Sequence, residues 1–241
     1  MQIVEIISRI GVDGARFIEE HIDPQFQALR HLYGSGIDSD AFVRLVVANA
    51  LVSYQLSGKG EEWWWEFARG FSNKNVSSIT KAYARFLPNS RTNRRLTPTK
   101  LKRLERVEPF LKSMDVEQYY RNMRALQEDL SDALGTSKNA KTVVFAVKMF
   151  GYAARIVMGK FRPYPMDIPI PVDSRIRRLT VRLGEKDPIR FWQGVAEETE
   201  VPPLHIDSIL WPAMSGNPEV QEKIRGAFGD VGEELIRFVG K

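Results

Sequence analysis

A lysine stands where a helix is expected to begin, in the stretch LGTSKNAKTVVFAVKMFGYA that covers residues 134–153. Small polar residues follow Gly135 in a hairpin pattern, and Lys141 falls in the first turn of the apolar helix that comes next. The N-terminus of a helix carries partial positive charge and therefore disfavours an ammonium group. An amine that gives up its proton easily is a nucleophile. Taken alone, a lysine in this position more commonly binds a phosphate or faces solvent.

An aspartate is the second candidate for chemistry. The segment KFRPYPMDIPIPV, residues 160–172, contains four prolines, which prevent a regular helix and predict an extended chain. The segment ends at Asp173, directly before the helical pattern SRIRRLTVRL, so Asp173 is predicted to cap that helix. A carboxylate that accepts backbone N–H groups stays ionised and is suited to stabilising positive charge.

Helical periodicity positions these residues and runs through almost the whole chain. Strand alternation is not evident, so the predicted fold class is all-α. Ser137 or Asn139 is the expected cap of the helix that begins near Lys141. The other helices are expected at 1–10, 14–21, 24–33, 38–56, 60–71, 75–86, 97–113, 116–134, 174–183, 188–198, 218–228 and 231–238.

Composition excludes several classes of protein. The 241 residues include no cysteine, which rules out disulfides, cysteine-ligated zinc and iron–sulfur clusters. The three histidines lack metal-ligand spacing with each other, so we expect no metal, although this spacing leaves an all-oxygen site open. We also expect no cofactor. No run approaches the ~18 apolar residues of a membrane span, and no signal peptide pattern opens the chain. We expect a cytoplasmic protein.

One segment is strongly basic. The net charge of the chain is +5, but residues 81–106 contain nine lysines and arginines and a single acid, Glu105. The centre of this segment, PNSRTNRRLTPT, is predicted to be a polar loop that carries Arg91, Arg94 and Arg95. Such a charge run is usually a solvated face, but its strong sign bias makes a nucleic acid an equally good interpretation.

The combination of these features resembles the helix–hairpin–helix DNA glycosylase superfamily. The hairpin LGTSKNAKTV lacks the second glycine of the common members, and the proline segment lengthens the interval from Lys141 to Asp173. Both departures are similar to the archaeal-type 8-oxoguanine DNA glycosylase (AGOG) family. Further stretches between residues 23 and 216 resemble it: DPQFQAL, SYQLSGKGEEWWWEF, NAKTVVFAVKM, PIPVDSR and DSILWPAMSG.

The resemblance implies a bifunctional DNA glycosylase and abasic-site lyase. Lys141 would be the nucleophile that forms a Schiff base with the sugar, and Asp173 would stabilise positive charge on that sugar. The resemblance also implies two helical lobes with a cleft between them, one at about 35–150 and the other made of 1–34 and 151–241.

The resemblance also implies the groups that hold the substrate. The base pocket would include Gln25 or Gln27, Trp64 or Trp65, and the residues Ser57, Lys148, Asp207 and Trp211. For each tryptophan taken singly, core packing is the safer assumption, and Trp63 to Trp65 point about 100° apart on a helix. Trp211 precedes a proline in a stretch with a loop-like pattern, and Lys148 is equally plausible as a surface lysine. The DNA backbone would bind Gly135, Thr136 and Ser137 together with Arg91, Arg94 and Arg95.

These implications lead to a concrete expectation. The chain should act as a monomer on damaged double-stranded DNA, with single-stranded DNA left open as a substrate, and should excise 8-oxoguanine. Two alternatives remain from the sequence, which are a non-catalytic nucleic-acid-binding protein and a glycosylase of the same fold that removes another damaged base.

Overall fold

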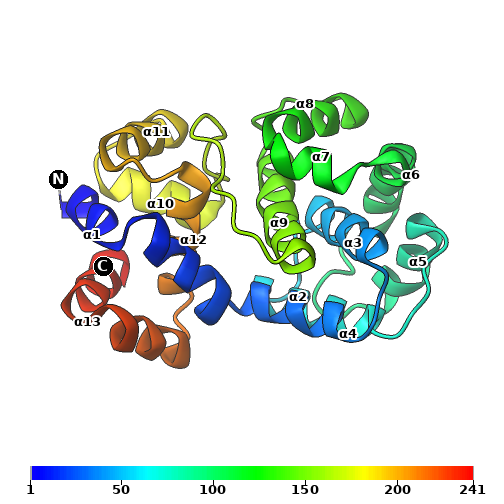
Figure 1. The fold of residues 1–241 in the computed structure, drawn as a ribbon, viewed down its shortest axis with the longest axis horizontal. Helices are drawn as coiled ribbons and strands as arrows, with labels where there is room; N and C mark the ends of the chain where they lie inside the picture. Colours follow the sequence, from blue (N-terminus) through cyan, green and yellow to red (C-terminus); the bar gives the residue numbers. More distant parts are fainter. Residues whose placement is uncertain (1, 241) are drawn as a thin grey trace. The chain divides into compact units, whose positions relative to one another are not determined.

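The computed structural model describes residues 2–240, and this range contains helices and no strand, so the all-α prediction is confirmed. The chain divides into two compact units (Figure 1). Unit 1 consists of residues 1–26 and 163–241, and unit 2 is the continuous segment 27–162. Helix α2 (Pro24–Gly34) begins in unit 1 and continues into unit 2.

Unit 2 is built around α9 (Lys141–Met158), which packs along α3 (Ser39–Leu51). Helix α9 is apolar on nearly all its faces, which is typical of a helix at the centre of a domain. The surrounding helices are α4 (Gly60–Phe71), α5 (Ile79–Phe86), the 3₁₀ turn η2 (Leu87–Asn89), α6 (Thr97–Ser113), α7 (Val116–Arg121) and α8 (Met123–Leu134). This arrangement holds the first residue of α9, Lys141, at the end of the central helix.

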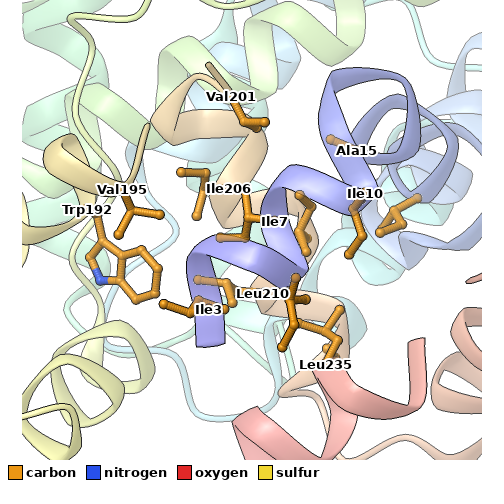
Figure 2. Packing of buried hydrophobic residues seen from close by; sticks show 14 of the residues in the cluster. Ile3, Ile7, Ile10, Ala15, Trp192, Val195, Val201, Ile206, Leu210 and Leu235 are labelled. Atoms are coloured by element: carbon orange, nitrogen blue, oxygen red, sulfur yellow. The ribbon is translucent and has the colours of Figure 1, made fainter. Parts of the chain in front are cut away.

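Unit 1 contains its own hydrophobic core. Its elements are α1 (Gln2–Phe17), the π-helix η1 (Ile18–Ile22), α10 (Ser174–Arg182), α11 (Pro188–Thr199), α12 (Pro203–Ala213) and α13 (Pro218–Gly240). Isoleucines 3, 7 and 10 of α1 pack against α12 and α13, where Ile206, Leu210 and Leu235 lie beside them (Figure 2). The proline segment before α10 is extended and irregular as expected, and Ile168 and Ile170 anchor it by burial.

Several predicted helix boundaries were wrong for local reasons. The single helix expected at 116–134 is two helices, because Asn122 leaves the helical region with φ of −138° and ψ of 77°, and its side chain caps α8. Helix α3 ends at Leu51 rather than near residue 56, and α5 begins at Ile79 rather than near residue 75. The expected interruption near residue 11 is confirmed, since Gly11 leaves the helical region with φ of 63°.

Between residues 2 and 240, we find no helix that combines the length and the apolar character needed to cross a bilayer.

Candidate functional site

The hairpin before Lys141 is fixed at both of its ends. Gly135 adopts the left-handed conformation that ends α8, and the Thr136 amide donates to the Ser131 carbonyl at 3.0 Å. Arg106 donates to the Leu134 carbonyl at 2.9 Å, and the Gln127 side chain donates to the Lys138 carbonyl at 3.0 Å. These side chains from α6 and α8 hold the hairpin in one shape.

The tip of the hairpin offers donors to a ligand. Within the described range, the amides of Ser137 and Lys138 donate no hydrogen bond, and both residues are exposed. The predicted cap of α9 is corrected by the structure, since the N-cap is Ala140, whose side chain cannot accept a hydrogen bond. Neither Ser137 nor Asn139 caps the helix. The positive end of α9 therefore has no side-chain acceptor at its cap, a favourable setting for a phosphate.

Lys141 is the first residue of α9 and its side chain is exposed. The next residue, Thr142, accepts a hydrogen bond from the Arg103 guanidinium at 3.0 Å, and the same nitrogen donates to the Leu51 carbonyl at 3.2 Å. Arg103 thus ties the start of α9 to α6 and to the end of α3. Sequence reasoning had included Arg103 only as part of the basic segment.

Lys148 lies seven residues after Lys141 on α9 and is 1% exposed, which excludes the surface-lysine alternative. Its Nζ atom lies 5.6 Å from the centre of the Tyr152 ring. Buried lysines are rare in proteins unless they are paired, so Lys148 belongs to the packed interior of unit 2.

The three adjacent tryptophans of α4 have different surroundings. Trp63 is buried and donates to the Ser53 hydroxyl at 2.8 Å, and Trp64 is buried at 1% exposure with its ring edge-on to Phe67. Trp65 is only partly buried and lies beside His31, with ring centres 5.6 Å apart. Of the three, Trp65 is the one that retains appreciable exposed surface. The other pocket candidates of unit 2 are Gln27, which is half-buried, and Ser57, which is exposed.

The polar loop predicted at residues 88–99 is shorter in the structure, because η2 and α6 take up its ends, and the remaining basic loop, residues 90–96, is anchored by one carboxylate. Glu66 accepts the Arg91 amide at 2.8 Å, the Thr92 amide at 3.1 Å and the Ser90 hydroxyl at 3.1 Å, and it also accepts the Thr92 hydroxyl. Burial alone would raise the pKa of Glu66, but these hydrogen bonds lower it below the ordinary value. The sequence gives no sign of this role because the partners lie at least 24 residues away.

A buried lysine also holds the basic loop in place. Lys100 is fully buried, donates to the Asn93 side chain, and lies 5.0 Å from the centre of the Tyr54 ring. Asn93 in turn donates to the Val52 carbonyl at 3.1 Å. Burial lowers the pKa of Lys100 to about 8. The three arginines of the loop, Arg91, Arg94 and Arg95, remain exposed.

In unit 1, Asp173 is the N-cap of α10, as predicted. One of its oxygens accepts the amides of Arg175 and Ile176, each at 2.9 Å, and the side chain is half-buried. The turn is tightened by the Asp173 amide, which donates to the Pro171 carbonyl at 2.9 Å. Both capping amides donate to Oδ1 of Asp173, and neither donates to its second carboxylate oxygen.

The remaining pocket candidates of unit 1 lie at the start of α2 and on α12. Gln25 is 3% exposed, and its amide donates to Asp23 at 2.8 Å. Asp207 is 4% exposed. Trp211 is partly buried, and the Arg175 guanidinium lies 5.0 Å from the centre of its ring. The loop predicted around Trp211 and Pro212 is corrected by the structure, because both residues belong to α12.

No group of three or more metal-ligating side chains occurs in the part of the chain that the structure describes.

Comparisons with known proteins connect this geometry to a family. The family model described as AGOG, N-glycosylase/DNA lyase, matches residues 4–236. An N-glycosylase/DNA lyase of Thermococcus kodakarensis is 55% identical over 229 residues, which cover 93% of this chain and 87% of that protein. The protein of the same description from Methanopyrus kandleri is 51% identical and covers 85% of each chain.

The fold is also found in a solved structure. The crystal structure of Pa-AGOG from Pyrobaculum aerophilum, described as an 8-oxoguanine DNA glycosylase complexed with 8-oxoguanosine, is 29% identical. It superposes with a TM-score of 0.83 over 99% of this chain and 94% of that chain. The predicted helix–hairpin–helix glycosylase fold and the recognised family are therefore confirmed: the chain belongs to the AGOG family of N-glycosylase/DNA lyases.

Proposed function

We propose that this N-glycosylase/DNA lyase excises 8-oxoguanine from DNA and then cuts the strand at the same nucleotide. The observation that carries the substrate assignment is the whole-chain likeness to Pa-AGOG, an 8-oxoguanine DNA glycosylase. The hairpin supports it as well, since it holds two unbonded amides and an uncapped helix start beside the exposed Lys141.

The proposed nucleophile is Lys141. Its neutral amine attacks C1′ of the deoxyribose, the glycosidic bond breaks, and the base leaves with a proton. The sugar ring opens to give a protonated Schiff base between C1′ and the lysine nitrogen. Loss of a C2′ proton then expels the 3′ phosphate by β-elimination, and water releases the lysine.

The proposed role of Asp173 is electrostatic. Positive charge develops on the sugar as the base leaves, and a fixed carboxylate lowers the energy of that state. Two backbone amides hold the carboxylate of Asp173 in place. It also assists the proton transfers at the sugar.

The extruded base is held by polar and aromatic groups. We assign base contacts to Gln25 or Gln27, Ser57, Lys148, Asp207 and Trp211, and to one of the pair Trp64 and Trp65. The partial exposure of Trp65 supports that residue as a stacking surface, while the burial of Trp64 supports a packing role behind the pocket.

The DNA backbone is held by two separate groups of donors. The hairpin residues Gly135, Thr136 and Ser137 lie against one phosphate, to which the unbonded amides of Ser137 and Lys138 donate, and the exposed arginines of the basic loop supply charge to others. The substrate is double-stranded DNA, and the enzyme works as a monomer in the cytoplasm at the nucleoid.

Borohydride trapping tests the nucleophile. The reagent reduces the Schiff base and links the protein covalently to an oligonucleotide that contains 8-oxoguanine. Lys141→Gln should abolish trapping while DNA binding persists. Lys138→Gln is the matched control, because Lys138 is an exposed lysine of the same hairpin whose ion pair with Glu128 is also exposed. Normal trapping by Lys141→Gln would reject this nucleophile.

Asp173→Asn tests the carboxylate, since asparagine also caps helices and should leave the fold intact. The variant should bind DNA normally and turn over poorly, and full activity would remove the assigned role.

A panel of oligonucleotides with oxidised, alkylated or deaminated bases tests which damaged base the enzyme removes. Strand cleavage confined to a base other than 8-oxoguanine would reject the substrate assignment.

A further inference from the structure

Unit 1 contains a fully buried carboxylate and imidazole that the reaction above does not use. Nδ1 of His205 lies 2.8 Å from Oε1 of Glu19, and both side chains are 0% exposed. The backbone amide of Tyr164 donates to Nε2 of His205 at 3.4 Å. Because an amide can only donate, Nε2 is the acceptor, and Nδ1 carries the proton that is donated to Glu19.

The pair joins two segments that are distant in sequence. Glu19 lies in the π-helix η1, which ends where the Asp23 amide donates to the Ile18 carbonyl at 2.8 Å. Asp23 then accepts the Gln25 amide at 2.8 Å and so begins α2. His205 lies in the first turn of α12, two residues before Asp207. The pair thus connects the segment that carries Gln25 to the helix that carries Asp207.

Stability does not explain a buried pair of this kind. The contact between η1 and α12 already has an apolar basis, because Ile18 and Ile22 share one core cluster with Ile206 and Ile209. Replacing both partners of a buried hydrogen bond by apolar side chains of similar shape can be nearly neutral for stability. Apolar contacts are not directional, so they do not determine how η1 is rotated on α12. A short hydrogen bond between the two elements does determine this rotation. π-Helical turns are also frequent at functional sites.

We propose that Glu19 and His205 form a positioning pair for recognition of the base. The hydrogen bond sets the register between η1 and α12, and so sets how Gln25 and Asp207 are presented to an extruded 8-oxoguanine. The inference rests on the proposed function. The pair acts in base excision and not in β-elimination, because a preformed abasic site has no base to recognise.

The central test compares two reactions in one variant. In Glu19→Leu/His205→Leu, two apolar side chains replace the pair, but the Tyr164 amide loses its acceptor at a cost of about 1–3 kcal/mol, so the unfolding temperature should fall by no more than roughly 12 °C. Strand cleavage at a preformed abasic site should remain within about twofold. Excision of 8-oxoguanine should fall roughly tenfold or more, the scale on which outer positioning partners act at other sites. Binding of free 8-oxoguanosine, followed by tryptophan fluorescence, should weaken in parallel.

Two single substitutions of His205 test the proposal even if the double leucine variant does not fold. His205→Asn keeps a donor near the Nδ1 position and should retain excision, whereas His205→Gln moves the donor one bond farther and should lose it. Equal excision by these two variants would overturn the proposal. So would normal excision by the double leucine variant, or a proportional loss of both of its reactions. Failure of the proposed function itself would be distinguishable, since the natural sequence would then leave 8-oxoguanine in place.

Discussion

The substitution Glu66→Gln should destabilise the protein measurably, because one carboxylate anchors the whole basic loop. Glutamine keeps a single acceptor oxygen, so at least one backbone amide of the loop loses its partner and the remaining bonds lose their charge assistance. A hydrogen bond to a charged group contributes about 1.5–3 kcal/mol and a neutral one about 0.5–1.5 kcal/mol. The expected cost is therefore about 2–4 kcal/mol. For a chain of this size, that corresponds to a fall of roughly 5–15 °C in unfolding temperature.

Thermal unfolding followed by circular dichroism measures this effect. The matched control is Glu62→Gln on the same helix, where an exposed carboxylate accepts a single amide, from Lys59, at 3.3 Å. That control substitution should lower the free energy of unfolding by less than about 1 kcal/mol.

The lowered pKa of Glu66 makes the stability of the natural sequence depend on pH. Its stabilisation is present above the ordinary carboxyl pKa and is lost as the pH falls through the lower, folded value.

The two proteins should accordingly converge in stability in acid. The DNA-binding readout is the dependence of affinity on salt, which should become shallower by about 0.9 for each phosphate contact that the loosened loop gives up. An unfolding temperature no lower than that of Glu62→Gln would refute the reasoning, because the carboxylate would then not be the anchor of the loop.

Three further variants test other features of the structure. Arg94→Ala/Arg95→Ala should reduce the salt dependence of DNA affinity by up to about 1.8, at about 0.9 per phosphate, while trapping at saturating DNA stays unchanged; an unaltered slope in a salt titration would exclude these arginines from the interface. Gly135→Ala should cost about 1–2 kcal/mol in denaturant unfolding, because alanine disfavours a φ of 58°; an unaltered midpoint would contradict this. Lys100→Met should abolish the rise in unfolding free energy expected between about pH 8 and pH 10.5, where the unfolded lysine binds a proton that the folded one, with a pKa of about 8, has released; a persistent rise would assign it to another group.

Helix positions were largely predictable because their causes are local. Apolar spacing identified the helices, and the polar residue at the end of the proline segment identified Asp173 as a cap. The same reasoning failed at Ala140, where a cap was expected from neighbouring polar residues but the chain turns one residue later. It failed again at Asn122, because the apolar spacing on both sides of the break is compatible with one continuous helix.

The candidate site was predictable only through its resemblance to a family. Lys141 and Asp173 could be chosen as candidates because each stands beside a strong local signal, a hairpin or a proline segment. The groups that support the site gave no such signal. Glu19 and His205 are 186 residues apart, and Glu66 looks like any polar residue of an amphipathic helix. Their roles depend on tertiary contacts, which periodicity does not encode.

The discontinuity of unit 1 has a consequence for synthesis. Unit 2 is one uninterrupted stretch and can complete its core as soon as residue 162 has left the ribosome. The apolar face of α1, in contrast, is covered by α12 and α13, which are made last. Translation proceeds at ~5–20 residues per second. The isoleucines of α1 therefore stay uncovered for on the order of ten seconds or more before α12 and α13 are synthesised. A nascent chain stalled before α12 should therefore be a preferred client of chaperones that bind exposed aliphatic segments.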